Sequence, residues 1–176
     1  ALPYSIYDVQ RNSGFVCVGT SHDTPMFAAE NIARWWSREG RRRYPNAREL
    51  VILADAGGSN GPRCRAWKYG LHHKLCNHYG LTVTVTHYPS GASKWNPVEH
   101  RLHSEISKNW KGRPLDSYET VLNYLNTTTT TTGLKVHASL DKKKYKKGIK
   151  ISDAQFCEIP VTYNDDLPRW NYTLEP

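Results

Sequence analysis

An apolar run that ends on an acid constrains the fold more than any other stretch of this sequence. Leu50-Val51-Ile52-Leu53-Ala54 is followed directly by Asp55 and then by the glycine-rich segment 57–61. A short apolar run bounded by turn residues is typical of a strand buried in a parallel or mixed sheet. Ligands of open α/β sheets bind at the carboxyl ends of the strands. Asp55 is therefore the first candidate site residue, and an Asx turn before the glycines is the alternative.

The segments around this run predict alternating strands and helices, which is typical of an α/β sheet. A turn between two β-branched and aromatic segments predicts a hairpin, and apolar residues at helical spacing predict a helix capped near Asp23. The expected elements are the hairpin over 4–9 and 15–20, a helix over 25–39, a strand over 49–55, a helix over 62–79, a strand over 81–86, and helices over 96–108 and 117–126.

The charge is uneven along the chain. Lys and Arg number 24 against 16 Asp and Glu, which gives a net charge of +8 and a pI of about 9.4. We expect a core over 1–126 and a basic C-terminal extension over 127–176, whose last dozen residues follow no regular pattern. Such a surplus of positive charge favours a polyanionic partner such as nucleic acid, and a solvated basic surface is the alternative.

Specific residues are candidates for contacts with that polyanion. Trp95 has two possible roles, because an aromatic ring can stack on or wedge into DNA or can pack its own loop onto the core. The run Arg41-Arg42-Arg43 is a further basic cluster. The candidate DNA-binding residues are Lys94, Trp95, Lys142, Lys143, Lys144, Lys146 and Lys147.

Neither a membrane span nor a cysteine framework is evident. No apolar run is long enough to cross a bilayer, so we expect no membrane partner. The four cysteines are scattered without a C-x-x-C pair, which favours a reducing, intracellular setting. A zinc site can be imagined, but its spacings match no common finger, and surface histidines on a helix are the preferred interpretation. Its members would be Cys64, Cys76, His72, His73 and His78.

Glu99 is a second candidate ligand. It lies in the first turn of the helix expected after the strand over 81–86, so it could reach the same sheet edge as Asp55. Carboxylate oxygens suit Mg²⁺ or Mn²⁺, and two such ions can stabilise both the attacking and the leaving oxygen of a phosphoryl transfer. The alternative is a capping box, in which Glu99 reaches back to the amide of Asn96. His103, one turn along, could orient Glu99 or could be an ordinary surface residue.

The longest motif resembles a known family. Its segments Ala54-Asp55-Ala56-Gly57-Gly58-Ser59-Asn60-Gly61, Trp67-Lys68 and 87–102, which ends Lys94-Trp95-Asn96-Pro97-Val98-Glu99-His100-Arg101-Leu102, are similar to DDE transposases of the ISAzo13 family. The similarity continues through 109–115, 132–136 and 170–173, and it includes 3–4, 7–8, 18–20 and 22–24 near the start.

This resemblance implies a fold, a reaction and a setting. The fold would be α/β, an RNase H-like mixed sheet flanked by helices, and the function DNA strand cleavage and transfer at transposon ends. Asp55 would be the second and Glu99 the third acid of the metal-binding triad. The resemblance further implies two Mg²⁺ or Mn²⁺ ions, transposon-end and target DNA as partners, at least a dimer, and a location in the bacterial cytoplasm at the nucleoid.

The first acid of the triad is the open question. In such folds it lies on a central strand before the hairpin, so we expect that strand upstream of Ala1. A chain without it would leave an unpaired slot between the hairpin and the Asp55 strand, and we expect it to be poorly stable and inactive by itself. The alternative first acid is Asp8, which could instead be an ordinary strand-end residue at a turn.

Two further functions are compatible with the sequence. Gly57-x-Ser59-x-Gly61 matches the nucleophile elbow of α/β-hydrolases, with His137 and either Asp116 or Asp141 as partners. The second is a DNA-binding transposase remnant without catalysis, in which the basic clusters contact phosphates.

Overall fold

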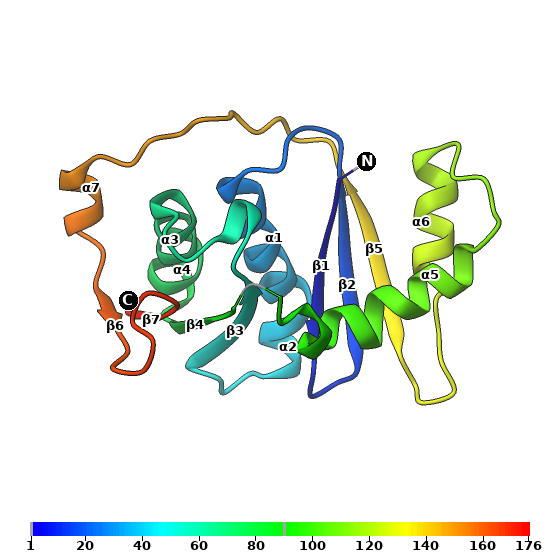
Figure 1. Ribbon diagram of the computed structural model, residues 1–176, viewed down its shortest axis with the longest axis horizontal. Coiled ribbons are helices and arrows are strands. Elements are labelled where there is room, and N and C mark those ends of the chain that lie inside the picture. Colours follow the sequence, from blue (N-terminus) through cyan, green and yellow to red (C-terminus); the bar gives the residue numbers. More distant parts are fainter. Residues whose placement is uncertain (1, 90) are drawn as a thin grey trace. The chain divides into compact units, whose positions relative to one another are not determined.

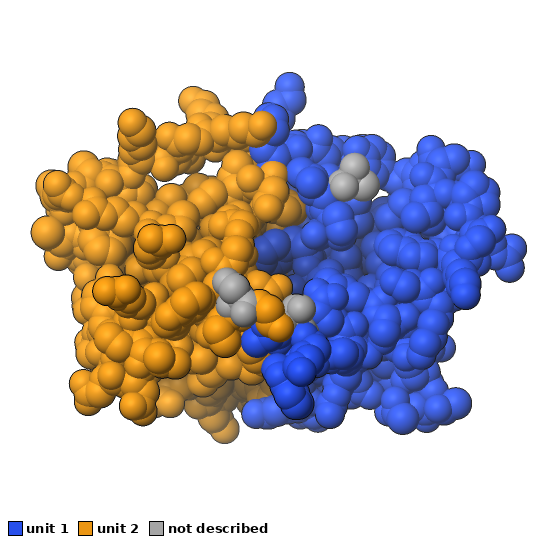
Figure 2. Space-filling model, in the orientation of Figure 1, with its two compact units in different colours: residues 1–22, 92–144 blue, residues 23–91, 145–176 orange. Residues whose placement is uncertain are grey.

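The computed structural model describes residues 2–89 and 91–176 as a mixed α/β protein with two sheets. The chain forms two compact units, each of which combines separate parts of the sequence (Figure 2). The first unit is Ala1–His22 with Ala92–Lys144, and the second is Asp23–Gly91 with Tyr145–Pro176.

The first unit is a three-stranded sheet with helices. Strands β1 (Leu2–Asp8) and β2 (Ser13–Gly19) form the predicted antiparallel hairpin, and β5 (Lys135–Asp141) pairs parallel to β2 (Figure 1). Its helical segments are η5 (Val98–His103), α5 (Ser104–Trp110) and α6 (Tyr118–Asn126). The core lies between them and consists of Val16, Val18, Leu102, Ile106, Leu125, Leu134, Val136 and Ala138.

The second unit is a four-stranded sheet in the order β3-β4-β7-β6. Strand β3 (Glu49–Asp55) is parallel to β4 (Thr82–Tyr88), whereas β7 (Asn171–Leu174) and β6 (Val161–Tyr163) are antiparallel. The helical segments are α1 (Pro25–Trp35), η1 (Trp36–Gly40), α2 (Arg41–Arg43), α3 (Arg65–Leu71), η3 (His72–Cys76), α4 (Asn77–Tyr79) and α7 (Asp153–Cys157).

The C-terminal part of the chain is more regular than its sequence suggests. Residues 127–176 contribute β5 to the first sheet and β6 and β7 to the second. The prediction that the last dozen residues are irregular is therefore wrong over 171–174, where alternate side chains Tyr172 and Leu174 are fully buried. Four residues are too few for a clear alternating pattern, so only pairing with β4 reveals this strand.

The start of α1 corrects a smaller prediction. Thr24 is the N-cap, since its hydroxyl oxygen accepts a hydrogen bond from the Phe27 amide at 3.1 Å, and Pro25 occupies the first turn. The cap is thus one residue later than Asp23. Thr24 is also 3% exposed, so this cap is part of the packed interior.

Strand β3 is less buried than its apolar sequence predicts. Val51 is 63% and Leu53 is 48% exposed. Side chains alternate between the faces of a strand, so these two residues share one face with Asp55, while Leu50 and the buried Ala54 lie on the other. β3 is also an edge strand with β4 as its one neighbour among the described strands, and β1 is one of the two edge strands described for the first sheet. The prediction of a buried strand is therefore wrong for the face that carries Val51 and Leu53.

The four thiols differ in accessibility, which gives a first testable prediction. Cys17 and Cys76 are buried, Cys157 is exposed, and Cys64 is intermediate. Burial raises the pKa of the Cys76 thiol to about 12, so the reactive thiolate is scarce near neutral pH. We expect Ellman's reagent to react quickly with Cys157, more slowly with Cys64, and with the remaining two only after unfolding. Cys157→Ser should remove the fastest phase, and equally fast reaction of all four thiols would contradict the packing.

Candidate active site

Asp55 ends β3 on the exposed face of the second sheet. It lies opposite Tyr88 in the register of β3 and β4. Burial raises the pKa of the Tyr88 hydroxyl, and the negative charge of Asp55 acts in the same direction. The following Gly58 has a φ of 73°, a left-handed conformation that favours glycine, and it starts the short 3-10 turn η2 (Gly58–Asn60). The sequence prediction of an acid at a strand end before a glycine loop is confirmed.

Two buried side chains hold the loop that follows Asp55. His87 of β4 is 4% exposed, and its Nε2 lies 2.8 Å from the Asn60 carbonyl oxygen. Lys68 of α3 is also 4% exposed, and its Nζ donates a hydrogen bond to the Pro62 carbonyl at 2.7 Å. Neither role was predicted from the sequence. One sequence pattern could have indicated the buried position of His87. In the alternating strand β4, His87 falls on the same face as the apolar residues Val83 and Val85.

Lys68 is surrounded by aromatic rings of the C-terminal segment. Its Nζ lies 4.6 Å from the ring centroid of Tyr172 and 5.3 Å from that of Tyr163. Burial lowers the pKa of the Lys68 ammonium, while the hydrogen bond and the ring faces stabilise its charged form. This residue thereby connects the loop after Asp55 to β6 and β7.

Glu99 lies in the first unit, at the start of η5. Its side chain is 42% exposed, and its Oε1 lies 3.2 Å from Nδ1 of His103, the contact expected from their helical spacing. Asn96 is 5% exposed, and its side-chain oxygen accepts a hydrogen bond from the Val98 amide at 3.2 Å. The Asn96 side chain thus caps the Val98 amide, while Pro97, which directly precedes η5, makes no side-chain cap bond; the reciprocal contact from Glu99 to the Asn96 amide stays a prediction.

Asp8, the alternative first acid, has a local contact. It ends β1 and is 7% exposed, and its Oδ1 accepts a hydrogen bond from the Arg11 amide at 3.2 Å. This is the geometry of an Asp that stabilises the turn of its own hairpin.

The two candidate ligands belong to different units, each described by itself. Within the described ranges 2–89 and 91–176, no group of three or more His, Cys, Asp or Glu side chains could hold a metal ion. The oxygen donors of Asp55 and Glu99 have the chemistry that Mg²⁺ and Mn²⁺ prefer, and both side chains are accessible. The donor type of these two side chains therefore fits a hard cation.

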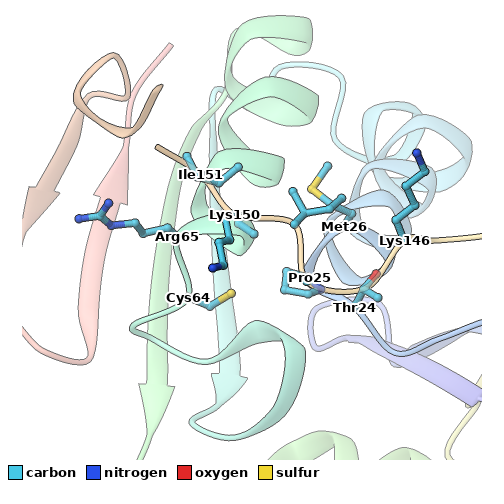
Figure 3. Close-up of a pocket in the computed structure, with 11 residues that line it drawn as sticks. Thr24, Pro25, Met26, Cys64, Arg65, Lys146, Lys150 and Ile151 are labelled. Atoms are coloured by element: carbon cyan, nitrogen blue, oxygen red, sulfur yellow. The ribbon is translucent and has the colours of Figure 1, made fainter. Parts of the chain in front are cut away.

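The predicted DNA-binding residues lie on the surface. Trp95 is 69% exposed with the Lys94 ammonium 5.1 Å from its ring centroid, so the interpretation that this ring packs onto the core is wrong. All five candidate lysines of the run 142–147 are exposed. Lys146 also lines a cavity of about 400 Å³ in the second unit together with Arg65 and Lys150 (Figure 3).

The residues of the hydrolase hypothesis belong to separate units, and two residues of the zinc hypothesis have other contacts. Ser59 lies in η2 of the second unit, whereas His137 belongs to β5 of the first. Cys76 is buried and its thiol contacts the Leu174 carbonyl oxygen at 3.6 Å, and the His73 ring stacks on Tyr69.

The sequence predicts no segment that crosses a membrane, and the helices of the structure bear on this prediction. No helix within the described residues has the length and apolar character needed to cross a membrane.

Comparison with known proteins gives one match. A family model described as the Rhodopirellula transposase DDE domain matches residues 1–176, the whole chain. No curated protein and no solved structure matches the chain.

Proposed function

Because the chain belongs to the Rhodopirellula transposase DDE domain family, we propose that it forms the catalytic part of a transposase that cuts and joins DNA by metal-dependent phosphoryl transfer. Asp55 and Glu99 are the metal-binding carboxylates in this proposal. The observation that carries it is the position of Asp55, exposed at the carboxyl end of a parallel strand and followed by a glycine loop. Such a loop lets backbone approach a phosphate closely.

The chain's own residues supply binding and orientation in this mechanism. Asp55 and Glu99 would hold Mg²⁺ or Mn²⁺, and two such ions, when bound, supply charge stabilisation for the attacking and leaving oxygens. The His103 contact fixes the direction of the Glu99 carboxylate. Exposed Lys94 and Trp95 would contact the DNA, by phosphate attraction and by stacking on a base. The lysines over 142–147 would add phosphate contacts.

The third carboxylate is the main structural element of the proposal. We infer an RNase H-like sheet, in which a further strand bearing an Asp pairs with the free edge of β3. Two observations support this: β3 has one neighbour among the described strands, and Val51 and Leu53 expose apolar surface beside Asp55. Asp8 is a poorer choice because it already stabilises the hairpin turn. The active assembly would contain at least two copies, since a transposon has two ends, and would act at the bacterial nucleoid.

Removal of divalent metal tests the reaction class. We expect a transposase that includes this chain and the proposed Asp-bearing strand to cleave transposon-end DNA with Mg²⁺ or Mn²⁺ and to lose cleavage in EDTA. DNA binding measured in the same buffers should persist without metal, because it rests on lysine–phosphate contacts. Cleavage that is unaffected by EDTA would overturn the proposal, and binding without cleavage at any metal concentration would favour a DNA-binding remnant.

A further inference from the structure

One buried histidine contacts two backbone carbonyl groups at once. The Nε2 of His87 lies 2.8 Å from the Asn60 carbonyl oxygen, and its Nδ1 lies 2.6 Å from the Trp170 carbonyl oxygen. Asn60 belongs to the loop after Asp55, and Trp170 directly precedes β7. The His87 ring therefore joins two segments that are far apart in the sequence.

The two acceptor groups limit which form of the ring matches both contacts. A carbonyl oxygen is only an acceptor, so each ring nitrogen must donate. A neutral imidazole has a single N–H and would direct a lone pair at one of the two oxygens, whereas an imidazolium has two N–H groups. With the ring 4% exposed, water has little access to relieve a mismatch. Both short contacts are satisfied only by the charged form.

The surroundings of His87 contain a second cation and aromatic rings. The ring centroid of Tyr172 on β7 lies 5.9 Å from that of the imidazole, and the Lys68 ammonium lies 4.6 Å from the same tyrosine centroid. No carboxylate of the described part of the chain forms an ion pair with His87. A positive charge on this ring would thus be stabilised by the two carbonyl dipoles rather than by an acid.

We propose that His87, as an imidazolium, is a positioning residue for Asp55. It lies opposite Ala54 in the β3–β4 register, so its side chain is on the other face of the sheet from Asp55 and does not touch the reacting groups. It acts through the loop, which it holds at Asn60 while Lys68 holds it at Pro62. The role in catalysis rests on the proposed function, whereas the double hydrogen bond does not.

His72 offers a matched control within the same unit. It is 5% exposed, and within the described residues neither ring nitrogen meets full hydrogen-bond geometry, although the Glu175 backbone lies near enough to favour the charged form. Burial lowers the pKa of His72, and the neighbouring His73 acts in the same direction. The two buried histidines should therefore carry different numbers of protons at neutral pH.

Ring-nitrogen NMR of the transposase labelled with [¹⁵N]histidine tests the protonation directly. We expect two protonated nitrogens for His87 and one protonated and one unprotonated nitrogen for His72 at pH 7, with His87→Gln and His72→Gln used for assignment. An unprotonated nitrogen at His87 would overturn the proposal. This measurement needs no variant to fold, since the assignment can also come from the ring contacts of His87 in the unaltered protein.

Hydrogen exchange and kinetics test the positioning role. His87→Gln should speed amide exchange over 57–62 about tenfold without changing exchange in β3 and β4, and it should lower kcat about 10- to 100-fold with an unchanged Kd for DNA. His72→Gln should change neither the amide exchange of the loop nor kcat. Unaltered loop exchange in His87→Gln would overturn the proposal. If the loop responds but Asp55→Asn keeps full activity, the proposed function fails while the double hydrogen bond stands.

Discussion

Replacing Asp55 by Asn is expected to lower the rate of metal-dependent DNA cleavage on the order of a thousand-fold or more. The amide keeps the size of the carboxylate but loses the charge that holds a divalent cation. Asp55 is exposed, and a thermal melt of the variant measured beside its activity separates a lost ligand from a lost fold. Single-turnover cleavage of transposon-end DNA with Mg²⁺, by a transposase that contains this chain and the proposed Asp-bearing strand, measures the effect.

Two control variants of the same kind distinguish the loss of a metal ligand from the mere loss of a negative charge. Asp153→Asn removes an 87% exposed carboxylate of the same unit that pairs with Arg65, and Glu105→Gln removes one that pairs with Lys108 in the helix after Glu99. Both should cleave at nearly the original rate. Glu99→Gln should lower the cleavage rate as much as Asp55→Asn does. The double variant should be only slightly slower than either single variant, since ligands of one site act as a unit. Activity within tenfold of the original in Asp55→Asn would rule out its role as a ligand.

The sequence predicted the order of elements around Asp55 because each has a local signal. The hairpin has a polar turn between β-branched segments, and α1 begins with Thr24 and Pro25. Burial was harder to predict, since it depends on which neighbours a strand obtains. Val51 and Leu53 have the composition of core residues, yet β3 has one described neighbour and their face is exposed. The short β6 and β7 were missed for the same reason, as long-range pairing with β4 defines them.

The candidate site was predictable only in part. Asp55 and Glu99 follow from an acid at a strand end and an acid at a helix start, together with the long motif around them. The contacts of His87 and Lys68 were not predictable, because their partners are backbone carbonyls of Asn60, Trp170 and Pro62, which no side-chain pattern marks. A residue that binds backbone has no partner whose type could be recognised in the sequence.

The edge of β3 leads to the second large effect that we expect. If the proposed function holds, the 176-residue chain by itself should give no detectable strand transfer with Mg²⁺ or Mn²⁺, because two carboxylates alone would hold the ions too weakly. A longer protein that adds the proposed Asp-bearing strand should recover activity, and the same protein with that Asp changed to Asn should not.

Stability should change together with activity, but for a different reason. A strand paired with β3 would add main-chain hydrogen bonds along its edge and bury part of the neighbouring apolar surface of Val51 and Leu53, which should stabilise the second unit. The Asp→Asn form of the longer protein should therefore gain the higher melting temperature without the activity, which separates the structural from the chemical contribution of the strand. Full strand transfer by the 176-residue chain would show that its own acids complete the site, and Asp8→Asn would then identify whether the hairpin acid is the third ligand.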